Sequence, residues 1–376
     1  MKKIYLLATL FAVTVCTTQA QSRRDKEQTY TLDKPYETVL VQPVKGKKVK
    51  NVILMIGDGM SLMHQYSAWT ANGGKLNIEN CPIVGLSKTY CANKLITDSG
   101  AAGTAMATGQ KTNYHSVGVD TNGNPLPSLT DIAKDKGLST GVVVTCRLND
   151  ATPAAFCANS PDRDDAEKIA ADYLNCNVDF IFGGGSKHFT QRKDKRNLIE
   201  EFKVKGYNTP QSWDELKDIK QTPIFAVVDT LDLPVPSMRG EVLGDASMKA
   251  IELLSKNKKG FFLMVEGSQL DDYGHFNDLD LLMQEVHDFD RTVGRILQWA
   301  EKDGETLVIV TADHETGGLT LVGGDKNTNT IVGKFSTGGH SGVMVPVYSY
   351  GPGSQDFGGI YENTSIFDKI KKLLKL

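Results

Sequence analysis

The chain has 376 residues, and 40% of them are hydrophobic. It is therefore too long for a small disulfide-stapled protein and apolar enough to form a large core. Its 42 Lys and Arg residues nearly balance its 45 Asp and Glu residues, which leaves a formal charge of −3. This balance gives no basic excess of the kind that binds nucleic acid and no acidic tail of the kind that stays disordered. The 36 Gly and 13 Pro residues follow no fixed period, which excludes collagen-like and low-complexity sequences.

The N-terminus has the pattern of a secretory signal peptide. Lys2 and Lys3 precede an apolar stretch over residues 4–15, and small side chains follow up to Ala20. We therefore expect cleavage near Ala20, which removes residues 1–20. The apolar stretch is shorter than the roughly 20 residues that cross a bilayer, and no later segment approaches that length.

A lipoprotein signal is the alternative interpretation of the same segment. Cys16 would then carry the lipid, but Val15 is bulkier than the small residue that precedes a lipidated cysteine. Both interpretations place the protein outside the cytoplasm, either in the periplasm or secreted from the cell.

Five cysteines remain after such a cleavage: Cys81, Cys91, Cys146, Cys157 and Cys176. An exported protein can form disulfides, and the odd number leaves at least one thiol free. Cys81 and Cys91 could pair, although the connectivity does not follow from the sequence. None lies in a Cys-x-x-Cys pair, so a cysteine zinc site is not expected. Cys146 and Cys157 have the character of small buried apolar residues.

Residues 21–50 are polar and rich in lysine, which predicts an extended arm or linker. From residue 51 onward, continuous apolar runs alternate with helical patterns. Such runs predict strands that are buried on both faces, and they cover 51–56, 140–145, 178–182, 261–265, 306–311 and 343–348. The helical patterns cover 129–136, 164–174, 241–255, 279–302 and 364–374.

This alternation predicts an α/β fold with a doubly wound, mostly parallel central sheet and helices on both faces. Residues 186–240 are polar, with scattered prolines and weak periodicity, so we expect a small peripheral insertion there. Residues 51–376 are predicted to form a single domain that includes this insertion.

Ionisable side chains follow the ends of four predicted strands. These residues are Asp58, Asp150, Glu266 and the pair Asp313 and His314. Ligands of open α/β sheets bind beyond the carboxyl ends of the strands. One aspartate at such a position is typical of a turn, but four strand ends with acids or histidine indicate a shared site.

Two further stretches carry metal-ligand residue types. Asp271 and His275 are four residues apart, so they share one face of a helical turn, and His340 lies in a Gly-Gly-His-Ser-Gly segment. Mixed His and Asp ligands suit zinc, and all-oxygen ligands suit magnesium. The other histidines have no such context and are expected to be structural or surface residues: His64, His115, His188 and His287.

Ser99 is the candidate nucleophile. The small residues at 100–105 allow a helix to pack tightly, and the N-terminus of such a helix favours an anion. The alternative is that Ser99 caps the helix, as an Asp or Ser before a helix usually does. No Ser-His-Asp triad motif is visible, so a metal ion must activate the hydroxyl group if Ser99 is the nucleophile.

Together these segments resemble the alkaline phosphatase family, especially its small bacterial members. The motifs occur in the family's order, from residue 51 to about residue 361, which is nearly all of the chain after its signal peptide. They are Gly57-Asp58-Gly59, Thr97-Asp98-Ser99-Gly-Ala-Ala-Gly-Thr-Ala, Asp150-Ala-Thr152-Pro-Ala-Ala, Glu266-Gly-x3-Asp271-x3-His275, Thr311-Ala-Asp313-His314-Glu-Thr-Gly-Gly and Gly339-His340. The resemblance implies the alkaline phosphatase fold and hydrolysis of phosphate monoesters.

The resemblance also implies two zinc ions and one magnesium ion per chain. The first zinc ion would be held by Asp271, His275 and His340, the second by Asp58, Asp313 and His314, and the magnesium ion by Asp58, Thr152 and Glu266, with Asp150 at its bound waters. Ser99 would attack phosphorus and form a phosphoserine intermediate, while Arg163 would bind the phosphate group. An alkaline pH optimum and a homodimer are further properties that the resemblance implies, with small-molecule phosphate monoesters as substrates.

Two acids depart from the pattern of some family members. Asp272 stands where relatives carry Lys, His or Trp, and Asp150 stands where some carry His. If the two carboxylates face each other, they repel unless a cation intervenes, so we expect a stronger dependence on added magnesium. The alternative is that Asp272 points to solvent.

Two other functions compete with this interpretation. The same two-zinc core could serve a phosphodiesterase or a phosphonate hydrolase, whereas Arg163 favours monoesters with their extra negative charge. A zinc-stabilised binding protein without activity would lack the nucleophile or a ligand, and none is missing here. A sulfatase would need a Cys/Ser-x-Pro-x-Arg segment, which the residues after Ser99 do not provide.

Overall fold

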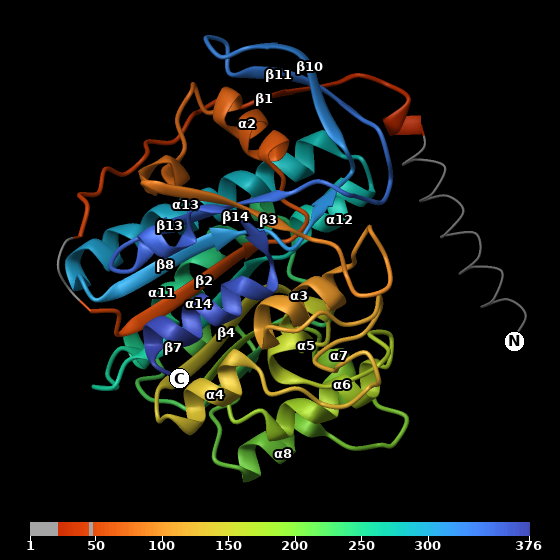
Figure 1. The fold of residues 1–376 in the computed structure, drawn as a ribbon. Coiled ribbons are helices and arrows are strands. Elements are labelled where there is room, and N and C mark those ends of the chain that lie inside the picture. Colours follow the sequence, from red (N-terminus) through yellow and green to blue (C-terminus); the bar gives the residue numbers. More distant parts are fainter. Residues whose placement is uncertain (1–21, 45–47) are drawn as a thin grey trace, which may run out of the picture.

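A nine-stranded sheet forms the centre of the computed structural model, which describes residues 22–44 and 48–376 (Figure 1). The predicted signal peptide over 1–20, with Cys16, lies outside the described residues. In spatial order the strands are β14 (Gly359–Glu362), β3 (Ile83–Lys88), β13 (Val345–Tyr350), β8 (Thr306–Thr311), β2 (Asn51–Gly57), β7 (Phe261–Gly267), β4 (Ser139–Arg147), β5 (Phe180–Gly184) and β6 (Ile224–Val227). Within this sheet β13 runs antiparallel to both neighbours, and the other adjacent pairs are parallel. The predicted α/β class with a mostly parallel central sheet is confirmed.

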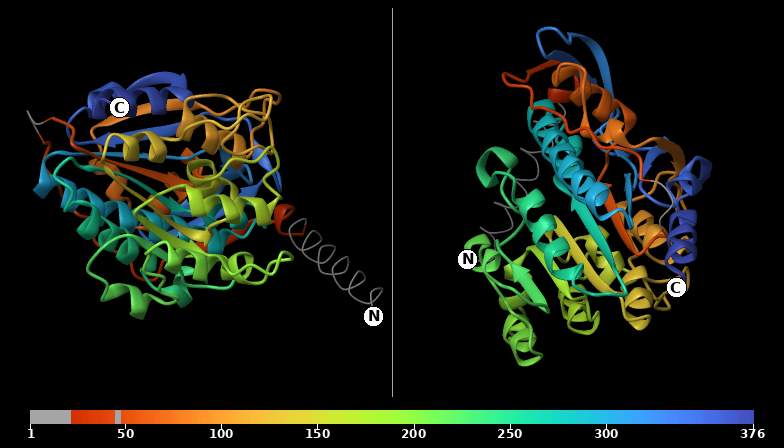
Figure 2. Two further views of the ribbon diagram at one scale, coloured as in Figure 1. Left: turned by 90° about the horizontal axis from the view of Figure 1, so that it is seen from below. Right: turned by 90° about the vertical axis from the view of Figure 1, so that its left-hand side faces the viewer.

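The central strands are buried on both faces. In β2, Ile53 and Met55 belong to one hydrophobic cluster, and Val52 and Leu54 belong to the other, because successive side chains of a strand point to opposite faces. The first cluster includes α2 (Leu62–Ala71), α11 (Val242–Leu254) and α13 (Leu279–Asp303), and the second includes α3 (Ser99–Thr108), α4 (Leu129–Asp135), α5 (Ala151–Cys157), α6 (Ala166–Asp172) and α14 (Thr364–Leu374). Figure 2 shows these two helical layers on either side of the sheet.

The six predicted strands and five predicted helices are present, and their ends differ from the prediction by no more than two residues. Three strands of the sheet, β3, β14 and β6, were not predicted, because none has a long continuous apolar run. β3 alternates between buried and partly exposed residues, β14 is largely exposed, and β6 has only 4 residues.

Strand β6 shows that part of the predicted insertion at 186–240 belongs to the central sheet. It pairs in parallel with β5 and extends the central sheet at one edge. The rest of the segment forms short helices: α7 (Ser186–Thr190), α8 (Leu198–Val204), α9 (Trp213–Lys217) and α10 (Pro236–Arg239). Figure 1 labels α7 and α8, and α10 packs against α13 through Arg239. The segment is therefore not wholly peripheral. The 4 buried residues of β6 are too short a run to stand out in polar surroundings.

The arm at 22–44 lies along the domain. Its strand β1 (Gln28–Thr31) pairs with β11 (Thr330–Phe335), which also pairs with β10 (Leu319–Asp325). Further along the arm, the hydroxyl group of Tyr36 donates a hydrogen bond of 2.7 Å to Asp290 on α13. The arm is thus fastened to the domain at both places.

The five cysteines named above are buried and free, so Cys81 and Cys91 form no disulfide in this structure. Cys81 belongs to the hydrophobic cluster under α2 and α13, whereas the thiol of Cys91 faces the carbonyl oxygen of Lys94 at 3.5 Å. None of the described helices combines the length and apolar content that a membrane span requires.

Candidate active site

Four neighbouring strands at the centre of the sheet, β8, β2, β7 and β4, carry the predicted acids at their carboxyl ends. Their register aligns these ends: Ile56 of β2 pairs with both Glu266 and Thr311, and Val144 of β4 pairs with Glu266. Asp58 therefore emerges between Glu266 and the segment that contains Asp313. The sheet thus assembles one site from segments far apart in the sequence.

Asp271, His275 and His340 form the first group of candidate ligands. Helix α12 (Gln269–His275) places His275 Nε2 3.2 Å from Asp271 Oδ2. Strand β12 (His340–Ser341) pairs with β9 (Glu315–Thr316), which brings His340 Nε2 within 3.4 Å of Asp271 Oδ1. One ligand atom from each residue lies within 4.8 Å of the other two.

The Nδ1 atoms of His275 and His340 already have hydrogen-bond partners. His275 Nδ1 lies 2.8 Å from the carbonyl oxygen of Gly338, and His340 Nδ1 lies 2.7 Å from that of Thr97. A carbonyl oxygen only accepts, so both Nδ1 atoms carry the proton. The two Nε2 atoms, 3.1 Å apart, are therefore the atoms left to coordinate a cation, and they converge beside the Asp271 carboxylate. This donor set therefore fits a metal ion with oriented ligands.

When no ion is bound, burial and hydrogen bonding act in opposite directions on the ionisation of this group. Burial opposes the charged form of His275, but its hydrogen bond to Asp271 and the charge of that carboxylate raise the pKa of His275 to about 9. Burial likewise opposes the charge of Asp271, yet hydrogen bonds from His275 and His340 hold the pKa of Asp271 well below its usual value.

Asp58, Asp313 and His314 form the second group. His314 Nε2 lies 3.0 Å from Asp313 Oδ2 and 3.5 Å from Asp58 Oδ1. Thr152 Oγ1 donates to the other oxygen of Asp58 at 3.3 Å, so Asp58 stands between this group and Thr152. Asp58 Oδ1 is buried without a hydrogen-bond partner among the described residues.

Buried carboxylates crowd this part of the site. Burial first, and the charges of neighbouring acids second, raise the pKa of Asp58 and of Glu266 well above their usual values. Among the neighbouring acids, Asp313 has the largest effect on the pKa of Asp58, and Asp150 has the largest effect on that of Glu266. Such a cluster is short of positive charge, which divalent cations would supply.

Ser99 is the first residue of α3 rather than its cap. The carboxylate of Asp98 takes the capping role and accepts hydrogen bonds from the N–H groups of Gly100 and Ala101, each at 3.3 Å. The hydroxyl group of Ser99 is thereby left to face His314 Nε2 at 3.1 Å. The rings of His314 and His340 stack with centroids 3.6 Å apart, so Ser99 lies beside both groups of ligands.

Arg163 lies at the same site. Its Nη1 is 3.0 Å from Asp98 Oδ2, and its Nη2 is 3.1 Å from Asp150 Oδ1. A cleft of about 480 Å³ gives access to these residues. The cleft wall includes Asp58, Ser99, Asp150, Arg163, Glu266, Asp271, Asp272, His275 and His340.

Sequence reasoning missed several residues of the cleft. His115 and His188, expected to be structural or surface residues, lie in its wall, and so does Arg147. Arg147 ends strand β4, so the rule that identified the acids at strand ends also applied to it. Asp98 directly precedes Ser99, and only the structure shows that its carboxylate contacts Arg163.

Asp272 is partly buried and lies in the wall of the cleft. Burial, followed by the charges of Asp271 and Asp150, raises the pKa of Asp272 to about 7, and Arg147 acts in the opposite direction. Arg147 Nη2 lies 2.6 Å from Asp150 Oδ2. Arg147 therefore pairs directly with Asp150, whereas its charge only partly offsets the repulsion that raises the pKa of Asp272.

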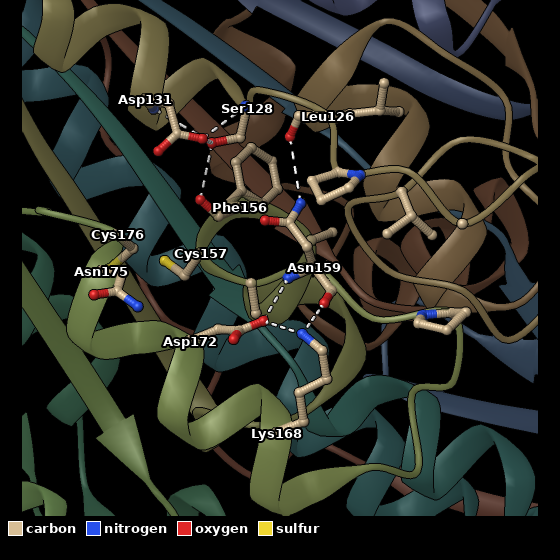
Figure 3. A pocket seen from close by; sticks show the side chains of 16 residues that line it. Leu126, Ser128, Asp131, Phe156, Cys157, Asn159, Lys168, Asp172, Asn175 and Cys176 are labelled. Carbon is tan, nitrogen blue, oxygen red and sulfur yellow. Dashed lines mark hydrogen bonds and ion pairs between the residues drawn. The ribbon is translucent and has the colours of Figure 1, made fainter.

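A second cavity, of about 320 Å³, contains none of the candidate ligands (Figure 3). Its charged groups are paired within its own wall. Lys168 Nζ lies 2.7 Å from Asp172 Oδ2, and Asp131 accepts hydrogen bonds from the backbone and the hydroxyl group of Ser128 at 2.9 and 2.8 Å. The cleft differs from it, because several of the cleft's carboxylates lie close to one another and raise each other's pKa.

Comparison with known proteins agrees with this geometry. The family model described as alkaline phosphatase matches residues 49–334. Alkaline phosphatase 4 of Bacillus subtilis is 35% identical over 87% of this chain and 89% of its own, and alkaline phosphatase of Escherichia coli is 30% identical over 88% and 87%. The solved alkaline phosphatase of the Antarctic bacterium TAB5 is 40% identical over 88% of this chain and 99% of that chain, with a TM-score of 0.84.

A variant of the TAB5 enzyme, in which aspartate replaces a histidine and magnesium is bound in the M3 site, is 38% identical over the same shares with a TM-score of 0.83. The shared fold, together with the acids and histidines around one serine, defines a metal-dependent phosphate hydrolase. The chain belongs to the alkaline phosphatase family, and it is a phosphoric monoester hydrolase.

Proposed function

We propose that this enzyme uses two zinc ions, one magnesium ion and a covalent phosphoserine at Ser99. Asp271, His275 and His340 would hold one zinc ion, and Asp58, Asp313 and His314 the other; Asp58, Thr152 and Glu266 would hold magnesium, with Asp150 at its waters. When bound, these ions neutralise the charge of the phosphate group and favour the ionised hydroxyl of the nucleophile.

The reaction of Ser99 proceeds in two displacements. In the first, Ser99 Oγ loses its proton to solvent and bonds to phosphorus as the bond to the leaving alkoxide breaks. In the second, a water molecule loses a proton to solvent as its oxygen bonds to phosphorus, the bond to Ser99 Oγ breaks, and inorganic phosphate leaves. Ser99 Oγ and the departed alkoxide each take up a proton from solvent. Ionisation of the hydroxyl group becomes easier as the pH rises, which accounts for an alkaline optimum.

Arg163 binds the phosphate group while two acids hold its guanidinium plane. Each Nη atom contacts one carboxylate, from Asp98 or Asp150, and keeps a second N–H for a non-bridging phosphate oxygen. A monoester dianion offers such oxygens and the charge to match. This arrangement favours monoesters over diesters.

The position of Ser99 Oγ, 3.1 Å from His314 Nε2, carries the proposal of covalent catalysis. Its test is Ser99→Ala with labelled phosphate monoester. We expect loss of both turnover and label incorporation into protein. Undiminished turnover in the variant would refute the covalent step, whatever the labelling shows.

The preference for monoesters over diesters has a direct test, because the two groups of candidate ligands would also suit a phosphodiesterase. A comparison of p-nitrophenyl phosphate with its bis ester measures this preference. We expect the monoester to be the far better substrate. Arg163→Ala should then lower kcat/KM for the monoester by a larger factor than for the bis ester, since the bis ester carries less charge.

We further propose that the protein is exported and acts as a homodimer. The segment before residue 21 supports export, and cell fractionation tests it. A shallow apolar groove formed by Leu62, Tyr66 and Trp69 of α2 with Tyr348 of β13 supports dimer formation, because Leu62 and Tyr66 expose 49% and 56% of their surface. Sedimentation of Tyr66→Glu beside the wild type tests whether this surface joins two copies.

A further inference from the structure

Arg147 contacts two acids at the edge of the cleft and lies near a third, and the mechanism above gives it no role. Its Nη2 lies 2.6 Å from Asp150 Oδ2, and its Nη1 lies 3.0 Å from Asp232 Oδ2. Asp272 is close enough for its charge to act on the guanidinium group. The positive charge of Arg147 therefore stabilises the ionised form of three carboxylates.

These contacts belong to a row of alternating charges, the ion-pair chain, which runs through Asp98, Arg163, Asp150, Arg147 and Asp232. Each oxygen of Asp150 contacts one arginine, with Arg163 at 3.1 Å and Arg147 at 2.6 Å. Asp98 caps the helix that begins with the nucleophile, and Asp150 caps α5. The ion-pair chain thus connects the phosphate-binding arginine to both helices.

Asp232 fixes the outer end of the ion-pair chain. Its carboxylate accepts a hydrogen bond of 2.8 Å from the backbone N–H of Arg147 as well as two from the guanidinium group, at 3.0 and 3.2 Å. The neighbouring Leu233 donates its backbone N–H to the carbonyl oxygen of Thr145 at 2.9 Å. The loop after β6 is therefore bound to the end of β4, and the direction of the Arg147 side chain is set in advance.

We propose that Arg147 is a positioning residue that affects phosphate and magnesium in opposite ways. By holding Asp150, it keeps Arg163 oriented for phosphate. By its positive charge, it weakens cation binding at the neighbouring Thr152 and Glu266. The inference rests on the proposed function, since it requires magnesium at that position.

The test uses the full-length zinc-loaded enzyme depleted of magnesium, with Arg147→Gln. Isothermal titration gives the dissociation constants of magnesium and of inorganic phosphate. Loss of the charge should tighten magnesium binding by about threefold to tenfold, and loss of the anchor should weaken phosphate binding by a similar factor. A variant that is simply misfolded would bind both magnesium and phosphate more weakly.

Two matched variants separate charge from geometry. Arg147→Lys keeps the charge but cannot hold two carboxylates with one planar fork, so magnesium binding should stay near that of the wild type while phosphate binding weakens. Asp232→Asn keeps Arg147 and removes its counter-charge, so magnesium binding should weaken.

Magnesium binding by Arg147→Gln that is unchanged or weaker would overturn the inference and leave the proposed ions intact. Failure of the wild type to bind any magnesium would overturn the proposed magnesium site and the inference with it. The two failures are therefore distinguishable in one set of titrations.

Discussion

At the scale of single residues, the site has more negative than positive charge, and its histidine side chains are oriented to coordinate a cation. The Nε2 atoms of His275 and His340 converge at 3.1 Å while their Nδ1 atoms donate to carbonyl groups. Asp58 and Glu266 are buried beside other acids. Cation binding follows from these contacts independently of any single motif.

Asp272→Lys tests the charge balance beside the proposed magnesium site. The new cation would lie among the carboxylates that Arg147 already serves, so the enzyme should need magnesium less. We expect the ratio of activity with and without added magnesium to fall by about threefold or more. Asp280→Lys is the matched control, because it makes the same charge change at an exposed residue of α13. An unchanged magnesium response in Asp272→Lys would refute this account of the acid pair.

Most of the candidate ligands could be brought together from local patterns, because they follow a strand end or share a helical turn. His340 and Thr152 fit neither pattern, and the family resemblance assigned them as ligands. Arg147 follows a strand end too, but its partner Asp232 is 85 residues away in the sequence, in a segment without a regular pattern. The capping role of Asp98 instead of Ser99 depends on a shift of one residue in the helix start. Sequence patterns do not resolve helix ends that finely.

Among the secondary-structure elements, the contact between α3 and α5 controls the site. A Cβ atom added at Gly103 would lie 3.2 Å from the Cβ of Ala155 and 3.5 Å from the Cα of Thr152. Ser99 begins α3 and Thr152 lies on α5. The separation of the two helices therefore sets the distance between the nucleophile and the proposed magnesium ligand.

Gly103→Val should force the helices apart. Overpacking of this kind costs about 1–3 kcal/mol, and we expect kcat to fall by about tenfold or more as Ser99 moves from its partners. The double variant Gly103→Ala with Ala155→Gly moves one methyl group across the contact and should recover most of the activity. Urea unfolding and steady-state kinetics measure both effects. Full activity of Gly103→Val at wild-type stability would contradict the argument.

The continuous apolar runs of β2, β4, β5, β7, β8 and β13 could be predicted, since a strand covered on both faces needs apolar residues throughout. β3 and β14 have partly exposed residues, and their pairing depends on tertiary contacts. The small residues after Ser99 correctly indicated a tightly packed helix. They could not indicate which helix it contacts.

For the molecule as a whole, the arm at 22–44 covers a buried histidine on α13. His287 lies against the rings of Tyr30 and Tyr36, with centroids 6.1 and 5.6 Å away. Neither of its ring nitrogens has a hydrogen-bond partner among the described residues. Burial first, and the charge of Arg291 second, lower the pKa of His287 from 6.5 to about 3.

This histidine should make the fold sensitive to acid. Because its pKa is lower in the folded state, the unfolded state binds the extra proton, and stability is lost as the pH falls from 6.5 towards 3. His287→Phe removes this effect without breaking a hydrogen bond. The variant should therefore gain roughly 2 kcal/mol relative to the wild type between pH 7 and pH 5. Urea unfolding of both proteins at the two pH values is the measurement, and an equal change in both would show that His287 is not buried as described.

The most direct test of the central claim combines metal analysis with turnover of p-nitrophenyl phosphate, before chelation, after chelation and after the ions are restored. The account predicts two zinc ions and one magnesium ion per chain, loss of turnover as they are removed, and recovery when zinc and magnesium return. Undiminished hydrolysis by enzyme whose metals have been removed would contradict it.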